Sequence, residues 1–488
     1  MQETIHTLTY AVRPRVVLKY SGQLSLMLSL LTLVPLAVAL FNTEWLLAQR
    51  YALICGVLLI AGITLARLPT PTRIQGNEAL SITALAFIIS PLLMSWPMMA
   101  ADIAFIDAWF EALSGVTTTG LSALGSVEQR SATFLFSRAW MQWYGGLGIV
   151  ILSVALLMGH HAATSRLVEP VESGERFVST ARSHARHSLL VYLGLTLLGL
   201  ALVWPLSGNG FDALLHVLSA VSTGGFSSYD NSLAQFGPDV AIAIMVIAFL
   251  SAVSLPLYWR VIHAGWLAGV RNFLGDIELR ALFIACLIAG ILLSLLAWFN
   301  HAETPWYHGL LMGLSAQTTT GYTTMQVAEL DPVSKLVMIL SMLIGGSVGS
   351  SAGGFKLLRL LIFLRMLQIF ISRAAMPPHA VSSTLLAGQK LDDDDIQRAL
   401  QLILLFIAVV FLSWLPFVAL GYDPLDALFE VVSACGTVGL STGITRPELE
   451  PALKAILCFD MLAGRLEIIA LLVVLYPRNW IGRREEIL

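Results

Sequence analysis

Hydrophobic residues fall into long and short runs along the chain. A helix that crosses a bilayer needs about 17 to 25 mostly apolar residues. Ten runs are long enough, one of them interrupted by small residues: 21–41, 50–66, 78–100, 134–158, 188–206, 239–264, 277–299, 334–370, 396–420 and 452–476. This pattern predicts an all-α polytopic membrane protein with ten spanning helices, of which only the eighth is visibly broken.

Four shorter apolar runs lie between these spans: 104–115, 211–220, 306–316 and 424–435. At ~1.5 Å per residue, a helix of this length covers roughly half of the hydrocarbon core. Each run therefore predicts a re-entrant helix, which enters the membrane from one side without crossing it.

The residues that follow the short runs repeat one pattern. The segments align without a gap: LSGVTTTGLS at 113–122, LSAVSTGGFS at 218–227, LSAQTTTGYT at 314–323 and VSACGTVGLS at 432–441. A Ser stands six residues before a Gly in each: Ser114 and Gly120, Ser219 and Gly225, Ser315 and Gly321, Ser433 and Gly439. Two spans separate consecutive glycines, so all four loops return to the same side in the same orientation.

This repetition predicts four pseudo-symmetric units of span, half-helix, loop and span around one axis. The first two spans stand outside the repeats. The expected boundaries are 1–72 for the N-terminal helix pair, then 73–180, 181–270, 271–375 and 376–488 for the four repeats.

Composition and charge fit a protein embedded in a membrane. Of 488 residues, 57% are hydrophobic and 12% are charged, whereas a soluble protein has about 25% charged residues. If ten spans are counted, the basic residues of the loops share one side, which the positive-inside tendency makes cytoplasmic together with both termini. These residues are Arg13, Arg15, Lys19, Arg67, Arg73, Arg166, Arg176, Arg182, Arg186, Arg271, Arg280, Arg365, Arg373, Arg478, Arg483 and Arg484.

The short runs fall on the opposite side, near a group of acidic residues. We expect these acids to be exposed and to attract cations, or else to be ordinary solubilising charges. The group comprises Asp102, Asp107, Glu111, Asp212, Asp230, Glu303, Asp423, Asp426 and Glu430.

The residue types of the four loops suit a cation. Irregular backbone at membrane depth is tolerated only where protein buries it or where it lines water. A ring of backbone carbonyls can replace the hydration shell of a monovalent cation. Gly permits positive φ and close approach to an axis, and Thr or Ser hydroxyls can satisfy neighbouring backbone groups. One such loop is more simply a capped helix end, but four in phase indicate a cation pathway.

These loops, TVGL at 437–440 above all, resemble the selectivity filter of potassium channels. Over nearly its whole length the chain resembles the Trk/Ktr/HKT superfamily of potassium transporters, in particular the TrkH/TrkG-type membrane subunit, which has the additional N-terminal helix pair. The resemblance implies potassium uptake across the bacterial cell inner membrane, with the potassium ion as substrate and no covalent cofactor. The filter residues that it implies are Thr118, Thr119, Gly120, Thr223, Gly224, Gly225, Thr319, Thr320, Gly321, Thr437, Val438 and Gly439. Each loop keeps one matched Gly where a potassium channel has two, which implies weaker discrimination against sodium.

A Gly-rich stretch, GGSVGSSAGGFK at 345–356, interrupts the eighth span. Small residues allow tight helix packing, but the stretch can also be a non-helical break beside a water-filled cavity. The family resemblance favours the second interpretation and implies an intramembrane gate. The residues that it implies are Gly345, Gly346, Ser347, Gly349, Ser350, Gly353 and Gly354, with Lys356 at the inner end.

One charge lies deep in the last predicted span. Arg465, in the motif GRLE, stands about midway between Lys454 and Arg478. A charge at membrane depth is costly and usually functional, although a structural salt bridge with Asp460 or Glu467 is an alternative. The resemblance implies that Arg465 faces the pore beneath the filter and impedes ions.

The resemblance also implies a homodimer and a cytoplasmic TrkA-like ring of nucleotide-binding RCK subunits that sets the gate. The sequence has no Walker loop and no GxGxxG in a strand–turn–helix context, so nucleotide control would come from another chain.

Two other functions are open to the sequence. A sodium- or proton-coupled potassium symporter would have a midplane site made by broken helices, but one visible break and a common repeat orientation favour this less. An intramembrane enzyme would need a nucleophile with a base, or metal ligands, at membrane depth. The densest ionisable group there, Asp460, Arg465 and Glu467, lacks such a pattern.

Overall fold

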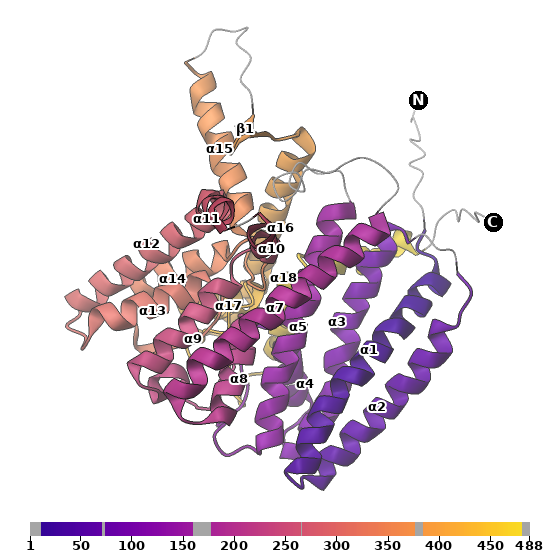
Figure 1. Cartoon of the computed structure of the whole chain (residues 1–488). Helices are drawn as coiled ribbons and strands as arrows, with labels where there is room; N and C mark the ends of the chain where they lie inside the picture. Colours follow the sequence, from indigo (N-terminus) through magenta and orange to yellow (C-terminus); the bar gives the residue numbers. More distant parts are fainter. Residues whose placement is uncertain (1–10, 71–73, 160–176, 265, 376–383, 481–488) are drawn as a thin grey trace.

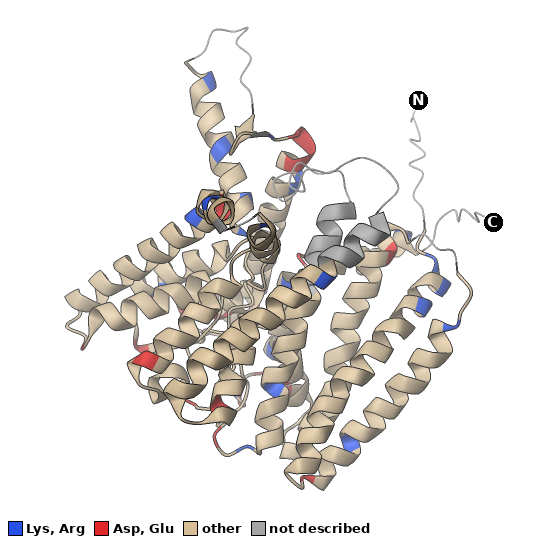
Figure 2. Cartoon of the chain, viewed as in Figure 1, with Lys and Arg blue, Asp and Glu red and all other residues tan. Residues whose placement is uncertain are grey.

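The computed structural model describes residues 11–70, 74–159, 177–264, 266–375 and 384–480, and it is almost entirely helical (Figure 1). Five of the basic residues predicted to be cytoplasmic lie outside this part: Arg73, Arg166, Arg176, Arg483 and Arg484. In Figure 2 most of the coloured charges gather near helix ends, and the long stretches between them are uncharged. This distribution suits helices whose middle portions face lipid.

Among the described residues, six helices are long and apolar enough to cross a membrane, or seven if the bent pair α9 and α10 counts as one span. The six are α1 (Pro14–Phe41), α2 (Trp45–Ala66), α3 (Gly76–Met98), α7 (Phe177–Ser207), α12 (Ile277–Phe299) and α16 (Asp393–Ala419). The bent pair is α9 (Pro238–Ser251) and α10 (Leu255–His263). The remaining predicted spans correspond to α5 (Ala132–Gly159), to α14 (Pro332–Ile344) with α15 (Leu357–Arg373), and to α18 (Pro451–Arg465) with α19 (Ile469–Leu475).

The four predicted short helices are confirmed. They are α4 (Phe105–Val116), α8 (Gly210–Val221), α13 (Pro305–Gln317) and α17 (Pro424–Cys435). Local signals explain where three of them begin. The side chains of Asn209 and Asp423 accept hydrogen bonds from first-turn amides of α8 and α17, and such caps satisfy otherwise unpaired donors. A Pro also opens α13 and α17, where its missing N–H does no harm.

The other described elements are short. They are α11 (Trp266–Gly275), the 3₁₀ turns η1 (Met99–Ala101), η2 (Ser232–Gln235), η3 (Val327–Glu329) and η4 (Pro477–Asn479), and the strands β1 (Leu385–Leu386) and β2 (Gln389–Lys390). The two strands form an antiparallel hairpin in which Leu385 pairs with Lys390 and Leu386 pairs with Gln389.

The prediction of a single broken span is wrong, because three are broken in the described part of the chain. The run 239–264 divides into α9 and α10, which meet at an angle of 83°. Pro256 lies in the first turn of α10, where it starts a helix and cannot donate to the one before it. The run 452–476 divides at Glu467 and Ile468, whose φ values are 52° and 63°. The second long helix is therefore broken in repeats 2, 3 and 4, whereas α5 of repeat 1 is continuous.

The N-terminal helix pair packs tightly and attaches to repeat 1. A Cβ on Gly22 would overlap α2, and a Cβ on Gly62 would overlap Leu26 of α1. The indole Nε1 of Trp140 in α5 donates to the carbonyl of Leu31 in α1 over 2.9 Å. The pair thus lies at one side of the molecule, as the indigo and violet helices of Figure 1 show.

Ion pairs join consecutive repeats near the short helices. Lys335 of α14 contacts Asp426 of α17, with 2.7 Å between Nζ and Oδ1. Lys454 of α18 forms an ion pair with Asp107 of α4 in the same way. This pair joins repeat 4 to repeat 1. Lys454 and Asp107 are 2% and 15% exposed, whereas Lys335 and Asp426 are 9% and 28% exposed.

We expect Asp107→Asn to lower stability more than Asp426→Asn does. The first change leaves a buried ammonium without a countercharge, at a cost of about 3 kcal/mol, while the second affects a more exposed pair. The measurement is the midpoint of thermal unfolding of the purified protein in detergent. The double variant Asp107→Asn/Lys454→Met should recover most of the loss. Equal losses from the two single variants would contradict the burial argument.

Candidate functional site

The four short helices end in the same hydrogen-bonded turn. The amide just before each loop Gly donates to the carbonyl of the Ser six residues before that Gly, over 2.8 to 3.0 Å. This is the Schellman arrangement, in which the residue after the helix C-cap, two positions beyond the last helical residue, adopts a left-handed conformation. That residue is a Thr in every loop: Thr118, Thr223, Thr319 and Thr437, with φ of 54°, 51°, 54° and 50°. Because positive φ strains a β-branched residue by ~1–3 kcal/mol, the surrounding structure must hold each of these Thr residues in place.

The four loops form a closed ring. We number them loop 1 (113–122), loop 2 (218–227), loop 3 (314–323) and loop 4 (432–441). Their glycines, Gly120, Gly225, Gly321 and Gly439, have φ between 76° and 94°, and a Cβ on any of them would overlap a carbonyl oxygen of the next loop. The oxygens belong to Gly224, Thr320, Val438 and Thr119 respectively. The contacts therefore run from repeat 1 through 2, 3 and 4 and back to 1.

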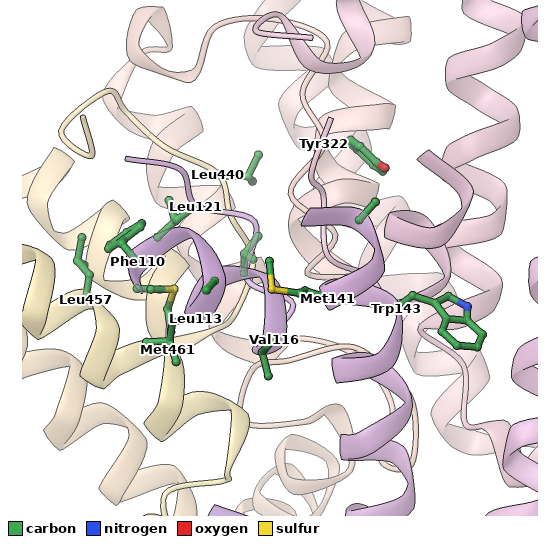
Figure 3. Close-up of a cluster of buried hydrophobic side chains, with 14 of the residues drawn as sticks. Phe110, Leu113, Val116, Leu121, Met141, Trp143, Tyr322, Leu440, Leu457 and Met461 are labelled. Atoms are coloured by element: carbon green, nitrogen blue, oxygen red, sulfur yellow. The ribbon is translucent and has the colours of Figure 1, made fainter. Parts of the chain in front are cut away.

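Apolar side chains hold this ring from behind. The residue after each Gly is at most 3% exposed: Leu121, Phe226, Tyr322 and Leu440. In Figure 3, Leu121 lies beside Phe110 of α4, and Leu457 and Met461 of α18 belong to the same cluster. The hydroxyl of Tyr322 also donates to the carbonyl of His216 in repeat 2 over 3.0 Å. Packing across repeat boundaries thus fixes the loop backbone.

Three acids that were predicted to be exposed are buried. Glu111 and Glu430 are 0% exposed, and Asp212 is 8% exposed. Glu111 accepts a hydrogen bond from Ser122 Oγ over 2.7 Å, and Glu430 accepts one from Ser441 Oγ. Both serines come two residues after a loop Gly. The prediction failed because a carboxylate with several hydrogen-bond donors is stable inside a protein, and here it braces the loop.

Repeat 2 has a histidine in the position of these two glutamates. His216 Nε2 lies 2.9 Å from Ser227 Oγ, so the brace is kept with a different side chain. In repeat 1, Arg138 of α5 pairs with Glu111 over 3.0 Å, which neutralises that buried charge.

The Gly-rich segment (345–356) lies against the Thr positions of the ring. The amide of Gly353 donates to Thr319 Oγ1 over 2.7 Å, and the amide of Gly354 donates to the carbonyl of Gly436 over 3.1 Å. A Cβ on Gly353 would overlap that carbonyl, so only Gly fits at this contact. The segment is non-helical between α14 and α15, as predicted.

Ser351 brings the same segment to loop 2. Its Oγ lies 3.3 Å from Thr223 Oγ1 and 3.1 Å from the carbonyl oxygens of Val221 and Ser251. Among the described residues, the buried hydroxyls of Thr118 and Thr437 have no hydrogen-bond partner. The segment is therefore hydrogen-bonded to loops 2, 3 and 4 near their strained Thr residues.

The break between α9 and α10 holds the Gly-rich segment from the side. The amide of Ser347 donates to the carbonyl of Ala252, and the amide of Leu255 donates to the carbonyl of Gly349, each over 3.1 Å. The other four predicted gate residues make local contacts. Ser350 Oγ donates to the Ser347 carbonyl, and Lys356 Nζ donates to the Ala352 carbonyl. The Gly346 carbonyl accepts from the amide of Leu357 at the start of α15, and Gly345 packs against Gly353 and Gly354. The broken spans of repeats 2 and 3 thus meet under the ring.

Arg465 joins the third break to the same place. It is 3% exposed, and its Nη1 donates to the carbonyl of Ser351 over 2.8 Å while Nη2 lies 3.4 Å from the carbonyl of Gly145. Within the described part of the chain it has no carboxylate partner, because Glu467 pairs with Arg359 and Asp460 accepts from Ser413. The alternative of a salt bridge with Asp460 or Glu467 is therefore wrong.

Two buried glutamines, which contact the Gly-rich segment and loop 2, were not predicted from the sequence as site residues. Gln317 Nε2 donates to the carbonyl of Gly345 over 2.8 Å, and Gln142 Nε2 donates to the carbonyl of Gly224 over 2.6 Å. Gln317 carries a signal, because the aligned positions of the other loops hold Val or Cys. Gln142 lies in a long apolar helix outside the repeated pattern, and nothing in the sequence singles it out.

The chain is similar to known proteins over most of its length. A family described as TrkH, cation transport protein, matches residues 69–480. The chain is 31% identical to an uncharacterized cation transporter of Methanocaldococcus jannaschii, over 94% of each chain. It is 27% identical to the Trk system potassium uptake protein TrkG of Escherichia coli, over 96% of this chain and 98% of the relative. The crystal structure of the potassium transporter TrkH from Vibrio parahaemolyticus matches with a TM-score of 0.84 at 25% identity, covering 96% of this chain and all of that one.

Proposed function

This chain belongs to the TrkH family of cation transport proteins, and from that premise we propose that it takes up potassium through the ring formed by its four loops. The names of several relatives and of the matching structure specify potassium. The observation that carries the proposal is the ring itself, in which each loop Gly lies against a carbonyl of the next loop.

The ring supplies oxygen atoms to a dehydrated ion in two layers. The carbonyls of Thr119, Gly224, Thr320 and Val438 form the first layer. The hydroxyls of Thr118, Thr223, Thr319 and Thr437 form the second, and this use explains why Thr is kept in a strained conformation. Carbonyl and hydroxyl oxygens replace the water of a monovalent cation at little cost. With one matched Gly in each loop, discrimination against sodium is weaker than in a potassium channel.

The Gly-rich segment acts as the gate. It lies across the inner side of the ring and bonds to Thr319, Gly436 and Thr223, so an ion leaving the ring meets packed backbone. Opening requires these hydrogen bonds to break. Its glycines give the segment the backbone freedom to move away without unfolding α14 or α15.

Arg465 adds an electrostatic barrier at the same level. Its guanidinium bonds to Ser351 of the gate and lacks a carboxylate partner among the described residues. A cation that passes the ring is repelled by this charge in a medium that screens poorly. Release of the gate from Arg465 would therefore lower both barriers together.

Of the two alternative functions, the coupled symporter is the one that the broken spans favour. Three broken spans meet beneath the ring, and broken helices often build the midplane sites of coupled transporters. Uptake that depends on an imposed proton or sodium gradient, and not on membrane potential alone, would favour this alternative. An intramembrane enzyme is disfavoured, because Asp460, Arg465 and Glu467 contact three different partners instead of one another.

We also propose the assembly and location that the family resemblance implies. Two copies form a homodimer in the bacterial inner membrane, with both termini in the cytoplasm, and a TrkA-like ring of nucleotide-binding RCK subunits sets the gate. The described basic residues Arg260, Arg271 and Arg280 lie near α11 and the inner end of the gate, where they offer such a partner a docking surface.

The first prediction concerns transport by the chain itself. Liposomes that contain the purified protein should take up potassium and rubidium faster than sodium and lithium when a membrane potential drives entry. If the intact chain is closed, a variant with 345–354 shortened should transport, because the gate is removed. Absence of flux from both proteins would contradict the pore.

The second prediction tests the ring. Gly321→Ser should lower the potassium-to-sodium permeability ratio by about tenfold, because the new Cβ displaces the carbonyl of Val438 from the ring. The matched control is Gly421→Ser, since Gly421 has φ of 89° but open space where a Cβ would lie. A ratio unchanged by Gly321→Ser in a folded protein would overturn the filter assignment.

The third prediction tests the barrier. Arg465→Ala should raise basal potassium flux by about tenfold because it removes an uncompensated charge from the pathway, whereas Arg465→Lys should keep most of the barrier. Arg15→Ala serves as the control, since it removes an exposed charge at the start of α1, outside the four repeats. Equal fluxes of Arg465→Ala and the parent protein in the liposome assay would exclude this role.

A further inference from the structure

Loop 2 differs from the other loops at the residue just before its Gly. This residue is Gly224, whereas loops 1 and 3 have Thr119 and Thr320 and loop 4 has Val438. Its backbone does not require a glycine, because Gly224 is absent from the residues with positive φ. Some other constraint must therefore exclude a side chain at this position.

The constraint is a side chain that arrives from repeat 1. A Cβ on Gly224 would overlap the terminal amide of Gln142, which extends from α5 and is 0% exposed. The space that Thr119 or Thr320 fills with its own side chain in loops 1 and 3 is thus filled in loop 2 by a residue from a neighbouring helix.

Gln142 uses both atoms of its amide on the loop. Its Nε2 donates to the carbonyl of Gly224 over 2.6 Å. Its Oε1 accepts from Ser219 Oγ over 2.6 Å and from the amide of Phe226 over 3.2 Å. The contacts reach from the end of α8 to the residue after Gly225, so a single side chain bridges the whole turn.

Loops 1 and 3 are held differently. Two hydroxyls bond to each other across the turn, with 2.8 Å between the Oγ1 atoms of Thr117 and Thr119, and 2.8 Å between those of Thr318 and Thr320. Loop 2 keeps a hydroxyl at the first of these positions, in Ser222, but has none at Gly224. Gln142 replaces the missing hydroxyl and makes a larger set of contacts.

We propose that Gln142 is a positioning residue for ion selectivity, which holds loop 2 of the ring at a fixed width. This inference rests on the proposed function, because it concerns the same ring. A smaller ion such as sodium is coordinated well only if the oxygens move inward. The Gln142 side chain, which we call the strut, resists that movement in loop 2, where the residue before Gly225 is Gly224 and has no side chain of its own.

The strut also makes the four carbonyls unequal. A carbonyl oxygen has two lone pairs, and in Gly224 one of them is taken by the Gln142 amide. The cation therefore meets one carbonyl that already carries a hydrogen bond from a glutamine side chain, beside three from loops that lack this strut. Loss of the amide frees the Gly224 oxygen to follow the ion, and this change favours the smaller ion.

The experiment compares ion selectivity in liposomes for three variants of the full chain. Gln142→Ala should retain potassium flux but lower the potassium-to-sodium ratio by roughly fivefold, the effect of one net hydrogen bond. Gly224→Thr alone should impair transport, because its side chain overlaps Gln142. The double variant Gln142→Ala/Gly224→Thr should restore selectivity, because the introduced threonine side chain then fills the vacated space and pairs with Ser222 as Thr119 pairs with Thr117.

Rescue of selectivity in the double variant distinguishes a positioning role of Gln142 from a general loss of structure. Thr196→Val is the control: it removes a buried hydroxyl that bonds to Trp143, the next residue of α5, without touching a loop, and it should leave the ratio unchanged. If Gln142→Ala fails to fold, the double variant alone decides the question. A double variant that folds and is selective supports the positioning role of Gln142. A double variant as unselective as Gln142→Ala, or a Gln142→Ala protein with the parent ratio, overturns it.

The parent protein distinguishes this inference from the proposed function. A parent that shows no potassium preference contradicts the ring as a filter. A selective parent whose ratio is insensitive to Gln142 leaves the filter in place and removes only the strut.

Discussion

The structure depends on the satisfaction of backbone polar groups at membrane depth. A loop inside the bilayer exposes N–H and C=O groups that lipid cannot bond, at a cost of several kcal/mol for each. The protein meets this constraint in the same way in all four repeats, with a Schellman turn in which amides of the loop donate to the last carbonyls of each short helix. The carbonyls of the ring lie beyond these turns, and in the proposed function a cation takes the place of a donor to them.

The same constraint places the polar side chains around the ring. Glu111, His216 and Glu430 stand at one position of their short helices, and each contacts the Ser two residues beyond the loop Gly. These three residues satisfy polar groups of the loop just after its Gly. Buried charge beside the loops is therefore a consequence of irregular backbone and not a separate functional element.

Much of this arrangement could be predicted from the sequence, because it follows from local patterns that recur. The short helices, the loop glycines and the non-helical segment all come from residue types at fixed spacing. The break between α9 and α10 was missed because Pro256 lies in a continuous apolar run, and hydrophobicity does not report the 83° bend. The burial of Glu111 and the strut of Gln142 were missed because each depends on residues distant in sequence, such as Arg138 for the first and Gly224 for the second.

The backbone symmetry of the ring conceals an asymmetry that bears on the proposed gating. Repeats 2, 3 and 4 each have a broken second long helix, and the breaks meet at the Gly-rich segment through Ala252, Gly349 and Ser351. Repeat 1 has a continuous helix, α5, which supplies Gly145 to Arg465 and Gln142 to loop 2. A continuous hydrogen-bonded helix is stiffer than a broken one, so in the proposed gating α5 would move less than the broken helices of the other three repeats. The hydroxyl of Thr118, in the loop of that same repeat, has no hydrogen bond to the Gly-rich segment in the described structure. In the proposed gating, the Gly-rich segment would withdraw from loops 2, 3 and 4 while loop 1 and α5 keep the ring in place.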